Sequence, residues 1–225
     1  MTQSVEKLIQ EGGVGYFGAM TASVSHEIKN CLAIMNENAG LMTDLILLSQ
    51  QRPPLDLERI QSITERITGQ IHRADTILKN LNVFSHSMDK PVQPVDLSQA
   101  VQLAASLGRR ISENRRITVQ HQPPEKPVEV TAPFFFLLYL IWTILEGALD
   151  AMPSGSTLDI TCSEKKGLPV ISLFSKAVIK PGIEKAMTLT ASQHLLTLIP
   201  VEVAVDSTTT ELIFGLPRPT HNPLP

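Results

Sequence analysis

The sequence has few aromatic residues, two cysteines and no run of basic residues. Phe, Trp and Tyr make up 4% of the 225 residues, and the formal net charge is -3. A weakly acidic chain does not attract nucleic acid, and so few aromatic side chains do not form stacking platforms for single strands. Cys31 and Cys162 lie far apart and outside any C-x-x-C motif. We therefore expect no nucleic-acid partner and two reduced, buried thiols.

The sequence also lacks a long hydrophobic run. Its longest apolar stretch, Phe134–Leu145, falls well short of the ~20 residues that a membrane-spanning helix needs, so it predicts a core helix instead. No basic segment followed by an apolar segment marks the N-terminus as a signal peptide. These absences predict a soluble, cytoplasmic protein without a membrane partner.

The most extended feature that the sequence does contain is a pattern of long amphipathic helices. Apolar residues recur three and four positions apart over residues 16–49, which predicts a helix that lays one stripe against partner helices. Residues 1–15 include three glycines and predict a frayed entry to this helix. Residues 50–55 carry two prolines, which end the helix and predict a turn.

A second helix is expected to begin after Asp56, which is placed to cap its N-terminus. A short loop between two long helices gives an antiparallel hairpin, and one hairpin cannot bury an apolar stripe along its full length. We therefore predict that two copies pair into a four-helix bundle and that the protein is a homodimer. The stripe of the second helix is formed by Leu57, Ile60, Thr64, Ile67, Ile71, Ala74, Leu78 and Leu81.

One histidine stands off the apolar stripe of the first helix. His26 lies two residues from both Val24 and Ile28, so at ~100° per residue its side chain points about 200° away from each of them, toward water. Asn30 follows one turn later on the same face, and Glu27 stands beside the histidine. Taken alone, this pattern is also compatible with a solvated helix face that has no function. An exposed imidazole with a carboxylate and an amide in reach is nevertheless a candidate chemical site.

The segment His26-Glu27-x-x-Asn30, followed by Leu32, resembles the phosphoacceptor box of the bacterial sensor histidine kinase family. Many members carry proline after the asparagine, whereas this chain has Cys31, so we expect a straighter helix here. The resemblance implies that a ring nitrogen of His26 accepts a phosphoryl group. It also implies that Glu27 holds or accepts the proton on the other nitrogen, and that Asn30 orients a water or a group of the partner.

The second half of the chain changes character. Residues 87–96 contain two prolines and predict a linker. After it, short helical and strand patterns alternate, which predicts one mixed sheet covered by helices on one face and an α+β fold class for the whole chain. We expect helices over 97–108, 133–152 and 183–198, and strands over 117–121, 128–130, 157–162, 170–174, 201–205 and 211–214.

The segment Leu145–Gly155 resembles the asparagine box of the same family, so the second half resembles its ATP-binding domain in a degenerate form. Gly147 stands where the family has the asparagine that coordinates the magnesium of the nucleotide, and glycine offers no oxygen ligand. Ser175–Val178 replaces the Asp-x-Gly-x-Gly segment that reads adenine. Leu189–His194 replaces the Gly-rich segment that cradles phosphates and contains no glycine. These departures predict a domain that does not bind ATP.

The sequence thus divides into three predicted parts. Residues 1–90 form the dimerisation and phosphoacceptor hairpin, residues 91–217 form the degenerate ATPase-like domain, an α/β sandwich, and residues 218–225 form a flexible tail. Because the remaining histidines have no metal-ligand spacing, no metal site is predicted. These histidines are His72, His86, His121, His194 and His221.

The two resemblances favour a histidine phosphotransfer protein, which passes a phosphoryl group between His26 and the aspartates of response-regulator receiver domains. The receiver would supply Mg²⁺, so we expect no cofactor bound by this chain. Two alternatives stay open at this point. One is an active but divergent sensor kinase that uses ATP. The other is a non-enzymatic scaffold or inhibitor that binds response regulators or a kinase.

Overall fold

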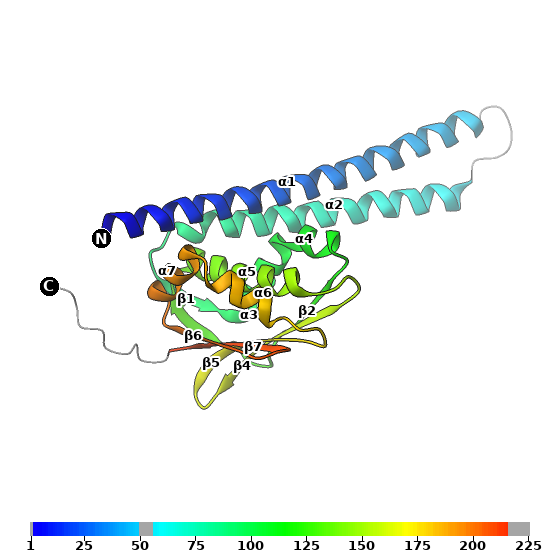
Figure 1. Cartoon of the computed structure of the whole chain (residues 1–225). Coiled ribbons are helices and arrows are strands. Elements are labelled where there is room, and N and C mark those ends of the chain that lie inside the picture. The colour runs from blue at the N-terminus through cyan, green and yellow to red at the C-terminus, as the bar shows by residue number, and fades with distance from the viewer. Residues whose placement is uncertain (1, 50–55, 216–225) are drawn as a thin grey trace.

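Figure 1 shows the computed structural model, which describes residues 2–49 and 56–215, with side chains described from residue 12 onward. Helices α1 (Thr2–Ser49) and α2 (Leu57–Ser85) form the predicted antiparallel hairpin. In Figure 1 this hairpin lies across the helical side of the rest of the chain, and its far end extends well beyond it. The predicted turn at 50–55 and the predicted tail at 218–225 lie outside the described residues.

The N-terminal part of α1 corrects one prediction. The expected frayed entry over residues 1–15 is wrong, because the helix already begins at Thr2 and continues through its glycines. Gly12 and Gly13 are tolerated because other helices approach them closely. A Cβ at Gly12 would lie 3.2 Å from the Tyr139 hydroxyl, and a Cβ at Gly13 would lie 3.2 Å from the Phe135 ring. Tertiary packing here outweighs the low helix propensity of glycine.

The second helix begins as the sequence predicts. The Asp56 side chain accepts a hydrogen bond from the Arg59 backbone N–H at 3.0 Å, which satisfies one of the free amides at the helix start. After α2, a single 3-10 turn, η1 (His86–Met88), leads out of the hairpin.

The second half of the chain is the predicted mixture of helices and strands, and the α+β fold class is confirmed. A five-stranded sheet has the order β2-β4-β5-β7-β6, with β2 parallel to β4 and the other pairs antiparallel. Strands β1 and β3 form a separate antiparallel pair. The elements are β1 (Gln93–Asp96), α3 (Leu97–Leu107), α4 (Arg109–Asn114), β2 (Thr118–Gln122), β3 (Glu129–Ala132), α5 (Phe134–Ala151), β4 (Thr157–Lys165), β5 (Leu168–Ser175), α6 (Lys180–Met187), α7 (Thr190–Leu198), β6 (Val201–Val205) and β7 (Thr209–Phe214).

Several details of this half differ from the sequence prediction. The expected single mixed sheet is wrong, because β1 and β3 pair with each other and not with the five-stranded sheet. A short helix, α4, follows α3 where the sequence predicts none. The end of the expected linker is a strand, β1, because Val95 is buried and pairs with Val130 of β3. The single last helix is instead two helices, since Leu189 has an extended backbone that turns the chain between α6 and α7. The Ser192 hydroxyl then donates to the Ala186 carbonyl across this corner.

The hairpin and the second half share one hydrophobic core. Tyr16 of α1 stacks on Tyr139 of α5 with ring centroids 4.8 Å apart. Phe84, at the end of α2, lies 5.5 Å from Tyr16 and 5.8 Å from Phe135, and it is fully buried. Further along α1, the buried Ser23 hydroxyl donates to the Leu107 carbonyl at the end of α3. Aromatic contacts of this kind stabilise a fold by more than the apolar area that they bury, so they attach the base of the hairpin firmly to the helical layer. The division at residue 90 stays a sequence prediction.

Two helices are long and apolar enough to cross a membrane by length and composition, the part of α1 from Gly12 to Ser49 and α5. Most of α5 is buried inside the fold, as the core helix of a folded domain requires. The core helix predicted at Phe134–Leu145 is therefore confirmed. Only 11% of the apolar stretch of α1 is buried, so much of its apolar surface is uncovered in this single chain. The cytoplasmic location stays a prediction.

One buried hydroxyl in the sheet supports a stability prediction. The Thr210 side chain of β7 is fully buried, and its Oγ1 has no hydrogen-bond partner in the described part of the chain. Because an unsatisfied buried hydroxyl costs about 1–3 kcal/mol, we expect Thr210→Val to raise the free energy of unfolding by about 1 kcal/mol in urea denaturation. The matched control is Thr143→Val, whose hydroxyl donates to the Tyr139 carbonyl at 2.8 Å and which should give no gain. A clear loss of stability in Thr210→Val would contradict this assignment.

Candidate functional site

His26 lies on the solvent side of α1. Val24 is buried, Ile28 is half-buried, and the His26 side chain is exposed, as its offset from the apolar stripe predicts. Within the described residues the ring has no hydrogen-bond partner, so both nitrogens are free to meet an incoming group. Asn30 is also exposed and follows one helical turn later on the same side. Both side chains are therefore accessible to a partner protein.

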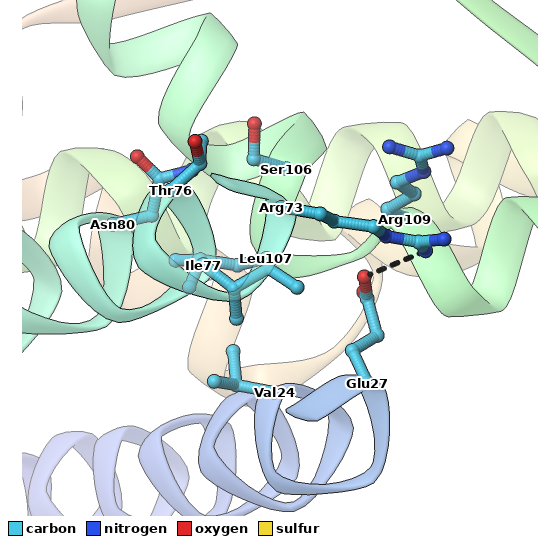
Figure 2. Close-up of a pocket in the computed structure, with 9 residues that line it drawn as sticks. All are labelled: Val24, Glu27, Arg73, Thr76, Ile77, Asn80, Ser106, Leu107 and Arg109. Atoms are coloured by element: carbon cyan, nitrogen blue, oxygen red, sulfur yellow. Dashed lines mark hydrogen bonds and ion pairs between the residues drawn. The ribbon is translucent and has the colours of Figure 1, made fainter. Parts of the chain in front are cut away.

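Glu27 lies in a different environment from its neighbour. It is only 4% exposed, and its carboxylate accepts a hydrogen bond from an Arg73 guanidinium N–H of α2 at 3.4 Å. Figure 2 shows this ion pair bridging the two helices of the hairpin. The structure thus brings His26 and Asn30 together on the solvent face, whereas Glu27 points inward to Arg73. Arg73 was not among the predicted site residues.

The Glu27–Arg73 pair lies at one edge of a cavity of about 280 Å³. The cavity lies between the hairpin and the second half of the chain, where α1, α2, α3 and the start of α4 meet (Figure 2). Arg109 of α4 and the Ser106 and Leu107 side chains of α3 form its wall on the side of the second half of the chain. One lining residue, Glu27, is therefore the sequence neighbour of the candidate phosphoacceptor, His26.

The segment that resembles the asparagine box is occupied by helix packing. At Gly147 of α5, an added Cβ would lie 2.8 Å from the Gly182 carbonyl oxygen and 2.9 Å from the Ala186 Cβ, both in α6. An added Cβ at Gly182 would lie 2.0 Å from the Gly147 carbonyl oxygen. The backbones of α5 and α6 thus touch at Gly147, the position where the sequence resemblance places the magnesium-binding asparagine of the histidine kinases. Any larger side chain there would have to push the two helices apart.

Two carboxylates of α5, those of Glu146 and Asp150, lie near the contact between α5 and α6 in the sequence. Burial raises the pKa of the Glu146 carboxyl, the nearby Asp150 charge raises it further, and Arg115 partly opposes both effects. Asp150 forms an ion pair with Arg115 at the end of α4. This pair explains how an acidic residue is tolerated at the C-terminal end of α5, where the helix dipole opposes it.

His121 and Cys162 lie close together in the second half of the chain. Burial lowers the pKa of His121, against an opposing effect of Asp96, and its Nε2 lies 3.9 Å from the Cys162 sulfur. Burial is also the main cause that raises the pKa of the Cys162 thiol to about 12, so this sulfur stays a neutral thiol at physiological pH. Both cysteines are free and buried. Among the residues that the structure describes, no group of three or more His, Cys, Asp or Glu side chains is placed to hold a metal ion.

One sequence relative supports the predicted resemblance. No family model matches the chain. Over 152 residues, the chain is 24% identical to the C4-dicarboxylate transport sensor protein DctB of Pseudomonas aeruginosa, an alignment that covers 68% of this chain and 24% of that protein. The chain thus spans about a quarter of the length of this relative. The homology to histidine kinases that the sequence predicts is confirmed.

Among the solved structures that are similar to this chain are two histidine kinases and a bacterial phosphotransferase. The catalytic domain of histidine kinase ThkA has a TM-score of 0.45 and 11% identity, and the match covers 56% of this chain and 94% of that one. Histidine kinase AdeS of Acinetobacter baumannii has a TM-score of 0.43 and 10% identity, with 84% and 96% covered. A bacterial phosphotransferase has a TM-score of 0.44 and 12% identity, with 88% and 94% covered.

Proposed function

We propose that this chain, a homologue of the sensor histidine kinases, is a histidine phosphotransfer protein of a two-component phosphorelay. The observation that carries the proposal is the exposed imidazole of His26, which has no hydrogen-bond partner among the residues that the structure describes, with Asn30 one turn away on α1. A receiver domain can approach this face without displacing any part of the described chain. The proposed partners are therefore response-regulator receiver domains, and the proposed location is the cytoplasm.

The proposed reaction needs few groups from this chain. The lone pair of His26 Nε2 forms a bond to the phosphorus of a receiver aspartyl phosphate, while the bond from phosphorus to the aspartyl oxygen breaks and the carboxylate leaves with that electron pair. A second receiver aspartate takes the phosphoryl group by the reverse step. The charge of the loose transition state is held by Mg²⁺, which the receiver supplies. Asn30 is placed to orient a receiver group or a water.

The proposed role of Glu27 requires a rearrangement. A carboxylate that accepts the proton of the second ring nitrogen keeps the attacking nitrogen basic. In the structure this carboxylate is paired with Arg73 and faces away from solvent. Glu27 would therefore have to leave Arg73 before it could assist His26, and docking of a receiver on the same face is the event that we propose for this exchange.

Three features support a phosphotransfer protein over an ATP-dependent kinase. The position of the magnesium-binding asparagine is Gly147, and α6 packs against it so closely that no nucleotide group fits between the two backbones. The segment Leu189–His194, at the start of α7, contains no glycine to cradle phosphates. The short connection between β5 and α6 leaves little chain for a lid over a nucleotide. Each contact to a charged phosphate is typically worth about 1.5–3 kcal/mol, so losing several leaves little of a micromolar affinity.

A two-arm assay tests the proposed function. In one arm the full chain is mixed with magnesium ATP, and in the other with a receiver domain phosphorylated on its aspartate. We expect no labelling and no calorimetric binding in the ATP arm, and transfer to His26 in the receiver arm. ATP-driven labelling of His26 would show a divergent kinase instead. No labelling of the protein in either arm, with every receiver encoded alongside it, would favour a non-enzymatic scaffold.

We further propose that the protein is a homodimer through its hairpin. The apolar stripe of α2 splits into two series with a seven-residue spacing. One series, Ile60, Ile67, Ala74 and Leu81, is half-buried in the single chain. The other series, Leu57, Thr64, Ile71 and Leu78, is exposed. An exposed seam with heptad spacing, together with exposed leucines on α1, fits a second copy of the same hairpin.

This seam gives a test of the dimer. Ile71 is 51% exposed in the single chain, so Ile71→Asp should leave the hairpin folded but put an unpaired charge into the dimer interface, at a cost of several kcal/mol. We expect a dimer for the wild type and a monomer for Ile71→Asp by light scattering at micromolar concentration. The matched control is Ser62→Asp, nine residues earlier and on the opposite side of α2, which should stay dimeric. A monomeric wild type would refute the proposal.

A further inference from the structure

The cavity between the hairpin and the second domain has the features of a ligand site. It has a volume of about 280 Å³ and lies where helices from two parts of the chain meet, a common place for small-molecule sites. Figure 2 shows side chains of opposite character around it. Its lining residues are Val24 and Glu27 from α1, Arg73, Thr76, Ile77 and Asn80 from α2, and Ser106, Leu107 and Arg109 from the second domain.

The charges of this lining favour an anion. Two guanidinium groups, those of Arg73 and Arg109, share the cavity with one carboxylate, that of Glu27. The Glu27 contact engages one Nη of Arg73 at 3.4 Å, a long distance for a charge-assisted bond, and the buried Arg73 Nε has no partner in the described part of the chain. An acceptor is therefore missing on the inner side of this arginine.

Arg109 retains donors for a ligand although it has a partner of its own. Its Nε donates to Glu113 at 2.6 Å, and both side chains of this pair are about half exposed. An ion pair this exposed contributes little to stability and is screened by salt. It also leaves the terminal nitrogens of Arg109 available to donate hydrogen bonds to a ligand. The lining thus includes two arginines, and the guanidinium of either one can bind a carboxylate through two parallel hydrogen bonds.

The rest of the lining favours an apolar body attached to the anionic group. Val24, Ile77 and Leu107 form the apolar wall of the cavity. The hydroxyl and amide groups of Thr76, Asn80 and Ser106 add polar contacts around the same space. An inorganic anion such as phosphate would leave the apolar wall uncovered, whereas a carboxylate with a short hydrocarbon chain would cover it.

We propose that this cavity binds a small carboxylate with a short apolar chain, held by Arg73 and Arg109. The ligand competes with Glu27 for Arg73, so binding frees the Glu27 side chain from its ion pair. The site does not depend on phosphotransfer, and it would exist in the same form if His26 had no chemical role.

The proposal is tested by titrating the full chain with pentanoate at constant ionic strength, followed by calorimetry and by NMR shifts of the Asn80 amide. Pentanamide, the neutral counterpart of the same shape, and inorganic phosphate are the comparison ligands. We expect pentanoate to bind at least about tenfold more tightly than either, the factor that one charge-assisted hydrogen bond typically contributes. Equal affinity for pentanoate and pentanamide, or no binding of pentanoate, would overturn the proposal.

Two variants test the identity of the site. Glu27→Gln removes the competing charge without changing the shape of the side chain, so we expect pentanoate affinity to rise about five- to tenfold. Arg109→Gln should lower it by a similar factor. Arg66→Gln, on an exposed turn of α2 outside the cavity, is the matched control and should leave the affinity unchanged. An unchanged affinity in Glu27→Gln and Arg109→Gln, with folding verified by circular dichroism, would place the ligand elsewhere and overturn the assignment.

Discussion

Replacing His26 by glutamine is expected to abolish phosphoryl transfer from a phosphorylated receiver, a loss of roughly 10³-fold or more, as for other enzymes that lose their nucleophile. Glutamine keeps a polar side chain of similar reach but offers no basic nitrogen to bond to phosphorus. Because the His26 side chain is exposed and has no partner in the described structure, the free energy of unfolding should change by no more than about 0.5 kcal/mol. The measurement is labelling of the protein from a phosphorylated receiver, with unfolding in urea measured alongside.

The matched control for this variant is His72→Gln. His72 is exposed on α2 and should retain full labelling. Labelling that persists in the His26 variant and maps to another histidine would contradict the assignment of the phosphoacceptor. Loss of labelling together with loss of fold would point to a structural role instead, and the urea measurement separates that case.

Introducing asparagine at position 147, as in the histidine kinases that the sequence resembles, is expected to destabilise the protein and not to create ATP binding. In Gly147→Asn, the first side-chain carbon already lies 2.8 Å from the Gly182 carbonyl oxygen, and the amide would be buried without partners. Overpacking and an unpaired buried amide together cost about 3–5 kcal/mol. Urea denaturation should show this loss, and calorimetry with magnesium ATP should show no binding.

The control for this variant is Gly69→Asn. Gly69 also lies inside a helix, but no atom lies within 4 Å of the Cβ that would be added there. The same substitution should therefore cost less than about 1 kcal/mol at Gly69. If Gly147→Asn were stable and bound ATP, the contact between α5 and α6 would be adaptable, and the proposal of a chain without ATP chemistry would fail.

The sequence predicts those parts of the site that depend on one helix. The offset of His26 from Val24 and Ile28 is enough to predict its exposure, because helix rotation is fixed at ~100° per residue. The direction of Glu27 could not be predicted in this way. It is set by which turn of α2 lies opposite, and the Arg73 partner is 46 positions away in the sequence.

The packing around the glycines of α1 and α5 could not be predicted from the sequence either. Local propensity predicts that Gly12 and Gly13 weaken a helix, yet α1 passes through both because α5 packs against them. The sequence also indicates that Gly147 lacks a metal ligand. It does not show that α6 occupies the vacated space, because that depends on Gly182, 35 positions further along the chain.

The aromatic contacts at the base of the hairpin have a mechanical consequence. Tyr16 and Phe84 fix the two helices where they join the body, and the Ser23 hydroxyl adds a second attachment a few residues before His26. Because these attachments lie close to His26 along α1, bending of the hairpin should displace its projecting end, which Figure 1 shows beyond the body, more than it displaces the histidine. In the proposed phosphotransfer, a docking receiver would therefore meet a histidine whose position is already fixed, and little conformational entropy would be lost when the two proteins bind.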